Sequence, residues 1–518
     1  MSGTIAVSEK KRRYDAVVVG AGNGGLGAAA QLAAKGARVL LLERHNLPGG
    51  FGSSFVRGRF EFETALHILC DYGPPEMPGS VRKFLVDELG LDIGMVPVPD
   101  AYHFMVTEEG IDAVMPLGVE EFIDAMEREV PGSRRPMTEY IALCKEVLDA
   151  LIYLGETKGN PDKRVLRTKY ANFLKTAAYS VQEVTDRFNI PERALKILYI
   201  YWLNIGPPVS RLNFTLWAGF MYKYLTMGGY IPRHRSHELM TALDARIRKL
   251  GGTTEYNTRV DRILVEKGRV RGIVTEYGEE IETRHVICNA SPTLAYNTLV
   301  YPKNEVPAAA LKNVNARREG VGVFVVYLGL DASADELGLK TYGYVVAPYI
   351  DTERLYESFS RPEAPIIQAT VCLNRAVPDC SPSGTCILTL TGLMRPEAWQ
   401  GVRPEEYYAA KTRMADAMIA QFESATRIKI REHIEEIEVA APGTFARYTG
   451  THNGIIYGYE PESWDSIIPR IASIQEEKYI DGLYFAGGFS FRALGYSSAL
   501  MSGQMTANLT LREMEAER

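Results

Sequence analysis

A glycine-rich turn near the start of the chain constrains its fold more than any other feature. Residues 14–20 (YDAVVVG) form a short β-branched run that ends at glycine, as a buried parallel strand does. Residues 24–35 are rich in alanine and leucine and stop at Gly36, a natural end for a helix. Residues 38–42 (RVLLL) predict a second strand. Together these pieces predict a βαβ unit and therefore a parallel α/β domain.

The turn has the spacing GxGxxG, which is typical of dinucleotide-binding sites. Its first glycine permits a tight turn, its second lets backbone approach a pyrophosphate, and its third lets the helix pack on the strand. Glu43 ends the second strand eighteen residues after Gly25, where a carboxylate can accept from ribose hydroxyls. We predict that the ADP part of a cofactor is held by Gly20, Gly22, Asn23, Gly24, Gly25, Glu43 and Arg44.

A second glycine pair follows in ERHNLPGG, residues 43–50. Gly49 and Gly50 fit a second approach of the backbone to the cofactor, near the pyrophosphate and ribityl chain. A simple loop turn is the alternative interpretation of this pair.

Several motifs resemble one family of flavoproteins. ERHNLPGG is similar to the E-x-x-x-x-P-G-G extension of amine oxidases, phytoene desaturases and their relatives. Residues 62–67 (FETALH) resemble the next segment of carotenoid isomerases and retinol saturases. The pattern there is nearer F-D-x-G-x-H, so Glu63 and Ala65 are departures. Residues 251–290 resemble the family's second FAD segment, and residues 484–503 its C-terminal FAD motif.

The resemblance implies that the cofactor is FAD. It places the backbone of Val260 at the adenine and adds Asn289, Ala290, Gly487 and Gly488 to the predicted contacts. The family usually has Gly-Asp where this chain has Gly487-Gly488, and that aspartate contacts the ribityl chain. Without the carboxylate, we expect flavin to bind more weakly or differently at Gly488.

The predicted fold class is α/β, or α+β overall, with a Rossmann-like FAD-binding domain and an inserted substrate domain. Strand-like runs between 319 and 400 predict an antiparallel sheet in the insert, beside helices at 118–130, 135–157 and 165–228. The FAD-binding domain is expected at 14–110, 235–300 and 430–518. The substrate-binding domain, with its helical subdomain, is expected at 111–234 and 301–429.

Flavin would carry the redox chemistry, so the protein need only orient the substrate and tune the ring. His67 matches a histidine of saturase-like sequences and is our first catalytic candidate, with packing beside the cofactor as the alternative. Tyr496 is the second candidate. It lies with Arg492 in the C-terminal turn expected near the flavin ring. The cluster RHRSH at 233–237 could bind a carboxylate or phosphate, or could simply start a helix with Ser236 as its N-cap.

The segment 198–230 is dense in aromatic and aliphatic residues, Trp202 and Trp217 among them. Such a segment suits the wall of an apolar substrate site, a patch that docks on a membrane, or ordinary core. The resemblance implies desaturation, saturation or isomerisation of carbon–carbon bonds in a polyene or other lipid, with an electron donor or acceptor that the sequence does not identify. The alternatives are a flavin amine oxidase and a lipid binder similar to Rab GDP-dissociation inhibitors.

Composition excludes several other classes of protein. Six scattered cysteines without a CxxC pair argue against a zinc site or disulfide framework, and no metal is expected. The formal net charge of -6 argues against a nucleic-acid partner. No run of about 18 apolar residues predicts a membrane span. A cytoplasmic location is expected, with membrane contact through the basic residues 10–13 as an alternative.

Overall fold

The computed structural model describes residues 12–65, 67–99, 102–157, 160–363, 366–461, 463, 478–490 and 495–517. A parallel five-stranded sheet lies at the centre of one half of the molecule, in the order β20-β13-β1-β2-β9. Its strands are β1 (Ala16–Val19), β2 (Val39–Leu42), β9 (Thr253–Glu255), β13 (Val286–Cys288) and β20 (Leu483–Phe485). The predicted βαβ unit is confirmed, because β1 and β2 pair in parallel.

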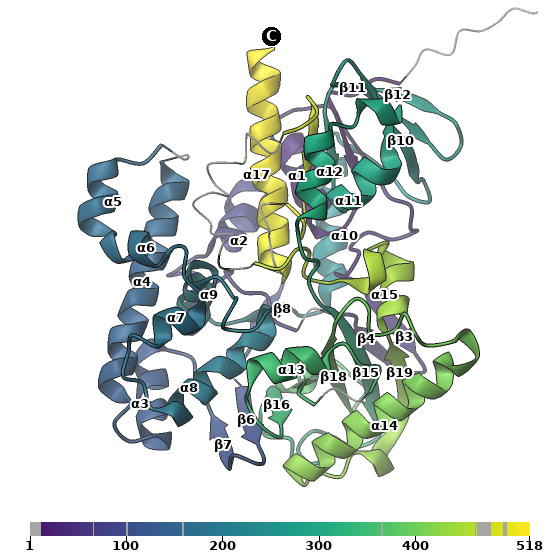
Figure 1. The fold of residues 1–518 in the computed structure, drawn as a ribbon. Coiled ribbons are helices and arrows are strands. Elements are labelled where there is room, and N and C mark those ends of the chain that lie inside the picture. Colours follow the sequence, from purple (N-terminus) through teal and green to yellow (C-terminus); the bar gives the residue numbers. More distant parts are fainter. Residues whose placement is uncertain are drawn as a thin grey trace, which may run out of the picture.

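Helices cover one face of this sheet and a second sheet covers the other, which makes three layers. The helices are α1 (Asn23–Ala34), α10 (Ser236–Lys249) and α17 (Gly495–Ala516), which share one apolar core with the sheet. Opposite them lie β10 (Val260–Glu266), β11 (Arg269–Thr275), β12 (Glu280–Glu282) and β14 (Val300–Tyr301). Helix α17 packs against α1 (Figure 1), so an element from the start of the sequence and one from its end lie side by side.

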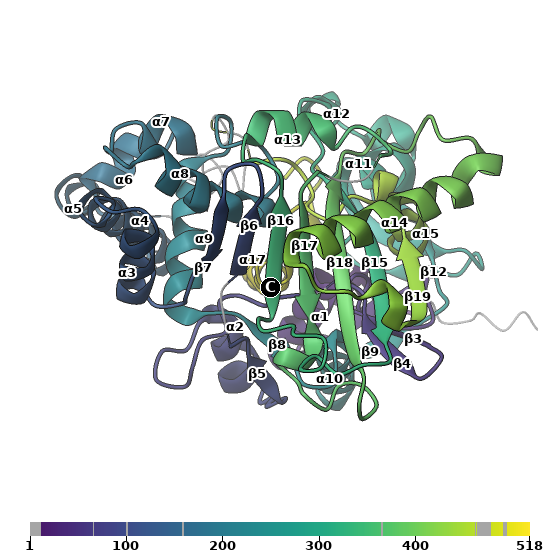
Figure 2. The ribbon, with the colours of Figure 1, turned by 90° about the horizontal axis from the view of Figure 1, so that it is seen from below.

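The other half is built on a seven-stranded sheet, in the order β19-β15-β18-β17-β16-β6-β7. The strands are β6 (Tyr102–Val106), β7 (Ile111–Val114), β15 (Gly322–Leu330), β16 (Gly343–Ala347), β17 (Gln368–Cys372), β18 (Cys386–Met394) and β19 (Ile434–Ala440). The antiparallel sheet predicted between 319 and 400 is confirmed by β15, β17 and β18. Figure 2 shows α14 (Tyr407–Thr426) lying across one face of it.

Sheet membership corrects two predicted domain limits. The prediction placed residues up to 110 and from 430 onward in the FAD-binding domain. Strand β6 instead pairs in parallel with β16, and β19 pairs with β15, so both belong to the seven-stranded sheet. The partner of β6 lies more than two hundred residues away in the sequence, so no local pattern indicates which sheet it joins.

Helices form a third region beside β6 and β7. They are α3 (Val119–Glu129), α4 (Arg134–Glu156), α5 (Lys163–Lys169), α6 (Ala171–Thr176), α7 (Val181–Thr185), α8 (Glu192–Tyr199), the 3-10 turn η2 (Ile200–Asn204) and α9 (Phe214–Met227). The predicted helices at 118–130 and 135–157 correspond to α3 and α4. Smaller elements connect the three regions: β3 (Ser54–Arg57), β4 (Phe60–Glu63), β5 (Met95–Pro97), β8 (Tyr230–Pro232), α2 (Ser80–Arg82), α11 (Pro292–Leu294), α12 (Ala308–Asn315), α13 (Thr352–Ser358) and α15 (Pro442–Thr449).

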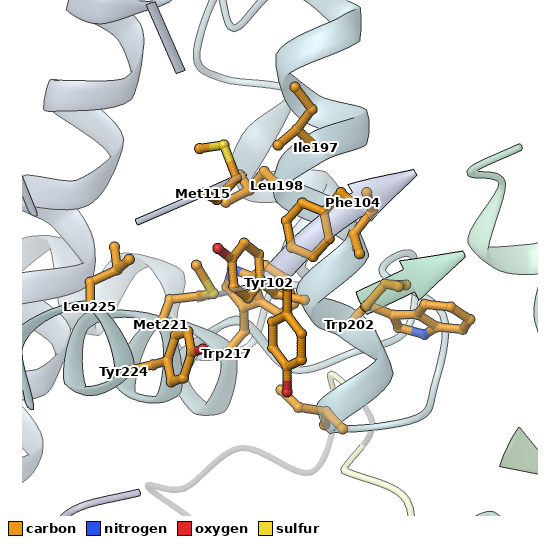
Figure 3. Close-up of a cluster of buried hydrophobic side chains, with 14 of the residues drawn as sticks. Tyr102, Phe104, Met115, Ile197, Leu198, Trp202, Trp217, Met221, Tyr224 and Leu225 are labelled. Carbon is orange, nitrogen blue, oxygen red and sulfur yellow. The ribbon is translucent and has the colours of Figure 1, made fainter. Parts of the chain in front are cut away.

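The two tryptophans of segment 198–230 lie in the core, which Figure 3 shows. Trp202 is fully buried and stacks on Phe359, with ring centroids 5.8 Å apart. Trp217 is also fully buried, and its indole N–H donates to the hydroxyl of Tyr140 at 2.7 Å. This part of the segment is therefore ordinary core rather than a surface that docks on a membrane.

Candidate functional site

The glycine turn leaves the start of α1 open toward a cavity. Gly22, the N-cap residue, precedes the helix in an extended conformation and has no side chain that could cap the first turn. Gly20 has φ +94°, a left-handed conformation that favours glycine. A Cβ at Gly25 would lie 1.9 Å from the carbonyl oxygen of Gly20, so the third glycine is needed for packing rather than for contact with a ligand.

Asn289 and Gly487 close over this turn from two other strands. A Cβ at Gly24 would lie 2.4 Å from the backbone nitrogen of Gly487, and one at Gly487 would lie 2.4 Å from Oδ1 of Asn289. Gly487 has φ +86°, and its N–H donates to the hydroxyl of Ser502 at 2.8 Å. Segments from the two ends of the chain thus form one cradle, and only glycine fits at these contacts.

Two polar side chains in the cradle suit a dinucleotide. Asn23 donates through Nδ2 to the carbonyl of Tyr496, while its Oδ1 is buried and has no hydrogen-bond partner among the described residues. The carboxylate of Glu43 accepts from the backbone N–H groups of Ala21 at 2.6 Å and His45 at 2.8 Å. An uncapped helix start, an unpartnered acceptor and a carboxylate at the end of β2 are the groups that a bound ADP moiety needs.

One cavity of about 1220 Å³ runs from this cradle into the second half of the molecule. The predicted contacts that line it are Gly20, Gly22, Asn23, Gly24, Glu43, Arg44, Gly49, Gly50, Val260, Asn289, Ala290, Gly487 and Gly488. Gly25 lies behind this wall and does not line it.

The far end of the cavity is apolar. From the helical region and β6 it is lined by Ile200, Leu203, Phe220, Tyr224, Tyr102 and Phe104. From the seven-stranded sheet it is lined by Val323, Val325, Val345, Ala369, Val371 and Leu393. Segment 198–230 thus contributes five lining residues, these four apolar or aromatic ones and Asn204, while Trp202 and Trp217 do not line the cavity. The strand residues have no local signal in the sequence.

His67 also lines this cavity. Its Nε2 is 3.1 Å from the hydroxyl of Thr391, and its carbonyl accepts from the hydroxyl of Tyr342 at 2.6 Å. Burial lowers the pKa of His67 to about 4, so the ring is neutral at neutral pH. Its partly accessible surface faces the cavity. A neutral imidazole can donate a proton from one nitrogen and accept one at the other.

Tyr496 also lines the cavity, but its hydroxyl already has a partner. It donates to the carbonyl of Phe51, in the turn that follows Gly49 and Gly50. Burial raises the pKa of Tyr496 well above its ordinary value, so the hydroxyl keeps its proton. This geometry suits a residue that positions the turn. Arg492, the other candidate of this segment, lies outside the described residues.

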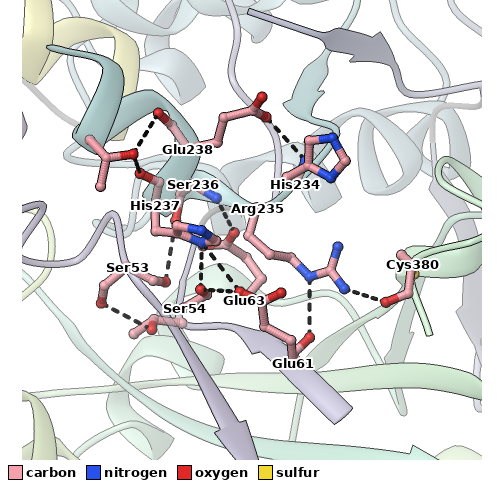
Figure 4. A network of polar contacts seen from close by, with 12 residues as sticks. Ser53, Ser54, Glu61, Glu63, His234, Arg235, Ser236, His237, Glu238 and Cys380 are labelled. Atoms are coloured by element: carbon pink, nitrogen blue, oxygen red, sulfur yellow. Dashed lines mark hydrogen bonds and ion pairs between the residues drawn. The ribbon is translucent and has the colours of Figure 1, made fainter. Parts of the chain in front are cut away.

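The basic cluster at 233–237 is occupied by contacts within the protein, as Figure 4 shows. Arg235 is buried, with φ +77°, and donates to the carbonyls of Glu61 and Cys380. Arg233 pairs with Asp379 at 2.7 Å. The cluster joins α10 to the β3–β4 hairpin and to the loop before β18, so these two arginines are not available for a substrate anion.

Ser236 is not the N-cap of α10, because Arg235 occupies that position. Ser236 is the first helical residue, and both its N–H (2.7 Å) and its hydroxyl (2.5 Å) donate to the carboxylate of Glu63. Glu63, one of the two departures from the family pattern, therefore caps this helix from another segment.

Comparison with known proteins assigns the chain to a family. A family model described as flavin containing amine oxidoreductase matches residues 24–509. All-trans-retinol 13,14-reductase of Rattus norvegicus is 24% identical over 540 residues, covering 98% of this chain and 87% of that protein. Chloroplastic prolycopene isomerase of Daucus carota is 23% identical over 532 residues, covering 98% and 82%. Cyclohexylamine oxidase from Brevibacterium oxydans aligns with a TM-score of 0.61 at 14% identity, covering 97% and 99% of the two chains.

The chain belongs to the flavin-containing amine oxidoreductase family. It is an enzyme that uses a flavin, and the predicted fold class is confirmed. In the part of the chain that the structure describes, no helix is long and apolar enough to cross a membrane. No group of three or more His, Cys, Asp or Glu residues there could hold a metal ion.

Proposed function

We propose that the chain is an FAD-dependent oxidoreductase that acts on carbon–carbon double bonds of a long apolar substrate such as a polyene. The observation that carries the proposal is the single cavity with a glycine cradle at one end and an apolar wall at the other. When bound, the flavin exchanges a hydride with a substrate carbon.

The chain's own residues would hold FAD along its length. Glu43 would accept from the ribose, the start of α1 would face the pyrophosphate, and Val260 would meet the adenine with its backbone. Asn23 offers a buried acceptor for a cofactor hydroxyl or N–H. The glycines leave the space that the cofactor requires, since a side chain at Gly22 would extend toward Asn289.

The apolar end would bind the substrate by burial rather than by charge. Burial of hydrocarbon yields roughly 25 cal/mol per Å², enough to hold a long chain without many polar contacts. Phe220 and Tyr224 of α9 present aromatic surface to the cavity, and Val323 and Val325 of β15 present aliphatic surface. The printed names of the two relatives, a retinol reductase and a prolycopene isomerase, support a polyene as the substrate class.

His67 is the proposed proton-transfer residue. It lines the cavity and is neutral, so it could give a proton to a substrate carbon or take one away. Thr391 holds one ring nitrogen, which fixes the orientation of the ring. The same arrangement serves reduction, desaturation or isomerisation, and the electron partner decides among them.

A rapid-mixing experiment tests the proposal against amine oxidation. The purified protein should show flavin absorption bands at about 370 and 450 nm. When the reduced enzyme is mixed with a long polyene, the flavin should become oxidised or the polyene should be converted to a product. The variant His67→Gln should slow that reaction without loss of flavin. If small primary amines reduced the flavin rapidly and no polyene or lipid affected it, the chain would be an amine oxidase instead.

A further inference from the structure

A short stretch of the helical region has an unusual charge pattern. Residues 163–175 (KRVLRTKYANFLK) form α5 and α6 and contain five cationic side chains and no acidic one. The chain as a whole has a formal net charge of -6, so this excess of positive charge is local. The five cations are Lys163, Arg164, Arg167, Lys169 and Lys175. We call residues 163–179 the basic tip.

The apolar side chains of the basic tip are anchored in the core, which directs its charges outward. Phe173 is fully buried and Tyr170 nearly so, while Val165 and Leu166 pack partly against the same core. All five cationic residues are exposed. Both overall views place α5 and α6 at the outer edge of the helical region (Figures 1 and 2).

Within the described part of the chain, the cations of the basic tip differ from their neighbours in having no ion pair with a carboxylate. On the adjacent α4, Arg135 pairs with Glu139 at 3.0 Å and Lys145 with Asp149 at 2.7 Å. Lys196 on α8 pairs with Glu192 and Glu109. Among the described residues, no ion pair involves any of the five cations of the basic tip, and Lys169 lies over the ring of Tyr170 at 5.1 Å.

Two neighbouring carboxylates, Asp162 and Glu146, already accept hydrogen bonds from helix starts. Asp162 caps α5 by accepting from the N–H of Arg164 at 2.6 Å. Glu146 of α4 accepts from the N–H of Asn172 at 2.9 Å and from its side chain at 2.8 Å. The positive charge of the tip is therefore directed to solvent.

Exposed apolar side chains accompany the charge. Leu174 is 39% exposed and Tyr179 is 49% exposed. Cations beside exposed leucine and aromatic side chains are typical of helices that lie at the interface of an anionic membrane. A nucleic acid would use the charge but gain little from Leu174.

We propose that the basic tip docks the protein on an anionic lipid membrane. Phosphate and carboxylate groups of the lipids would pair with the five cations, while Leu174 and Tyr179 would enter the interface. The core beneath the tip includes α9, which carries Phe220 and Tyr224 of the cavity wall. Docking itself does not depend on the proposed reaction.

Sedimentation of the whole protein with lipid vesicles tests this surface. The protein should bind vesicles of phosphatidylcholine with phosphatidylserine, bind vesicles of phosphatidylcholine alone weakly, and be released by salt. The test variant carries Lys163→Gln, Arg164→Gln, Arg167→Gln and Lys175→Gln. Each lost cation should weaken binding about fivefold, so the variant should lose more than about a hundredfold.

A matched control carries the same change of net charge on the neighbouring helices: Arg134→Gln, Arg135→Gln, Lys145→Gln and Lys196→Gln. It should bind vesicles almost as the wild type does, and both variants should keep their flavin content and melting temperature. A third variant, Leu174→Ser with Tyr179→Ser, should bind anionic vesicles several-fold more weakly.

Three outcomes would overturn the docking site. The wild-type protein could fail to bind anionic vesicles, or the tip variant and the matched control could lose vesicle binding equally. The wild-type protein could also bind a labelled oligonucleotide but no vesicle. Failure of the polyene assay with normal vesicle binding would count only against the proposed function.

Discussion

The two ends of the cavity are lined by different groups, the glycine backbone at one end and apolar side chains at the other. At the nucleotide end, backbone meets backbone: a side chain at Gly24 would collide with Gly487, and one at Gly25 with Gly20. At the apolar end, the wall is made of side chains from α9, η2 and the seven-stranded sheet. The first end therefore tolerates almost no substitution, whereas the second can be reshaped one side chain at a time. Binding of the cofactor and choice of substrate should respond separately to mutation.

The largest effect is expected at the nucleotide end. Gly22→Val places a branched side chain against the cradle, and Glu43→Ala removes the ribose acceptor. We expect each to lower the flavin content of the purified protein at least about tenfold, because both act on the pyrophosphate and ribose contacts. Absorbance of the protein-bound flavin measures this.

Asn204→Ala is the matched control, because Asn204 lines the other end of the same cavity. It should keep its flavin. Normal flavin content in both cradle variants would refute the assignment of this turn, and loss in the control would show that the two ends are not separable.

The second prediction concerns pH and two buried histidines. Burial lowers the pKa of both His67 and His285 to about 4 from an ordinary value of 6.5. Between these values only the unfolded state takes up a proton, so the free energy of unfolding falls as pH falls through this window. The slope is up to about 1.4 kcal/mol per pH unit for each histidine. Urea denaturation from pH 7 to pH 4 measures it.

The variants His67→Gln and His285→Gln should each flatten that slope, and the first should also slow turnover. Turnover should show no break near pH 6.5 from His67, because its ring stays neutral there. If neither variant changed the pH dependence of the free energy of unfolding, the account of these two rings as buried and neutral would be wrong.

The third prediction concerns the apolar wall. Phe220→Ala removes aromatic surface that faces the cavity and should raise the Michaelis constant for a long apolar substrate about tenfold, corresponding to about 1.4 kcal/mol of lost burial. Trp202→Ala, which also removes an aromatic ring from this region, should instead cost about 3–5 kcal/mol of folding stability. Steady-state kinetics and denaturation together distinguish the wall from the core. Equal Michaelis constants for wild type and Phe220→Ala would place the substrate elsewhere.

The smallest effect is expected at Gly488, where the family pattern that this segment resembles has aspartate. Gly488→Asp would return a carboxylate to the cavity wall, and we expect FAD to bind about 1–2 kcal/mol more tightly, the scale of a hydrogen bond to a charged group. Titration of the apoprotein with FAD measures the change. Unchanged or weaker binding would show that the backbone around Gly487 has replaced the missing contact.

The nucleotide end could be predicted from the sequence because its contacts are local. Thirty residues contain a strand, a glycine turn, a helix and Glu43, and the structure brings them together as their spacing indicates. The packing role of Gly25 was also predicted, although Gly25 itself does not line the cavity. The spacing did not reveal that Glu63 caps α10, because that contact depends on where a second segment lies in space.

The apolar end could not be predicted in the same way. Strand β15 is buried on both faces, so its sequence shows no alternation. Val323 and Val325 face the cavity side, while Phe324 and Val326 pack with α14. Segment 198–230 is dense in aromatic and aliphatic residues, so nothing local separates Phe220, which lines the cavity, from Trp217, which does not. Such assignments depend on long-range pairing.

An equilibrium titration tests most directly whether one cavity holds flavin and apolar substrate together. The oxidised enzyme is titrated with a long-chain saturated alcohol, which cannot react, while the flavin absorption band near about 450 nm is recorded. We predict a saturable shift of that band in the wild type, and the same shift at about tenfold higher ligand concentration in Phe220→Ala. Saturable binding of the alcohol without any change in the flavin spectrum would mean that the two sites are separate, and would contradict the account.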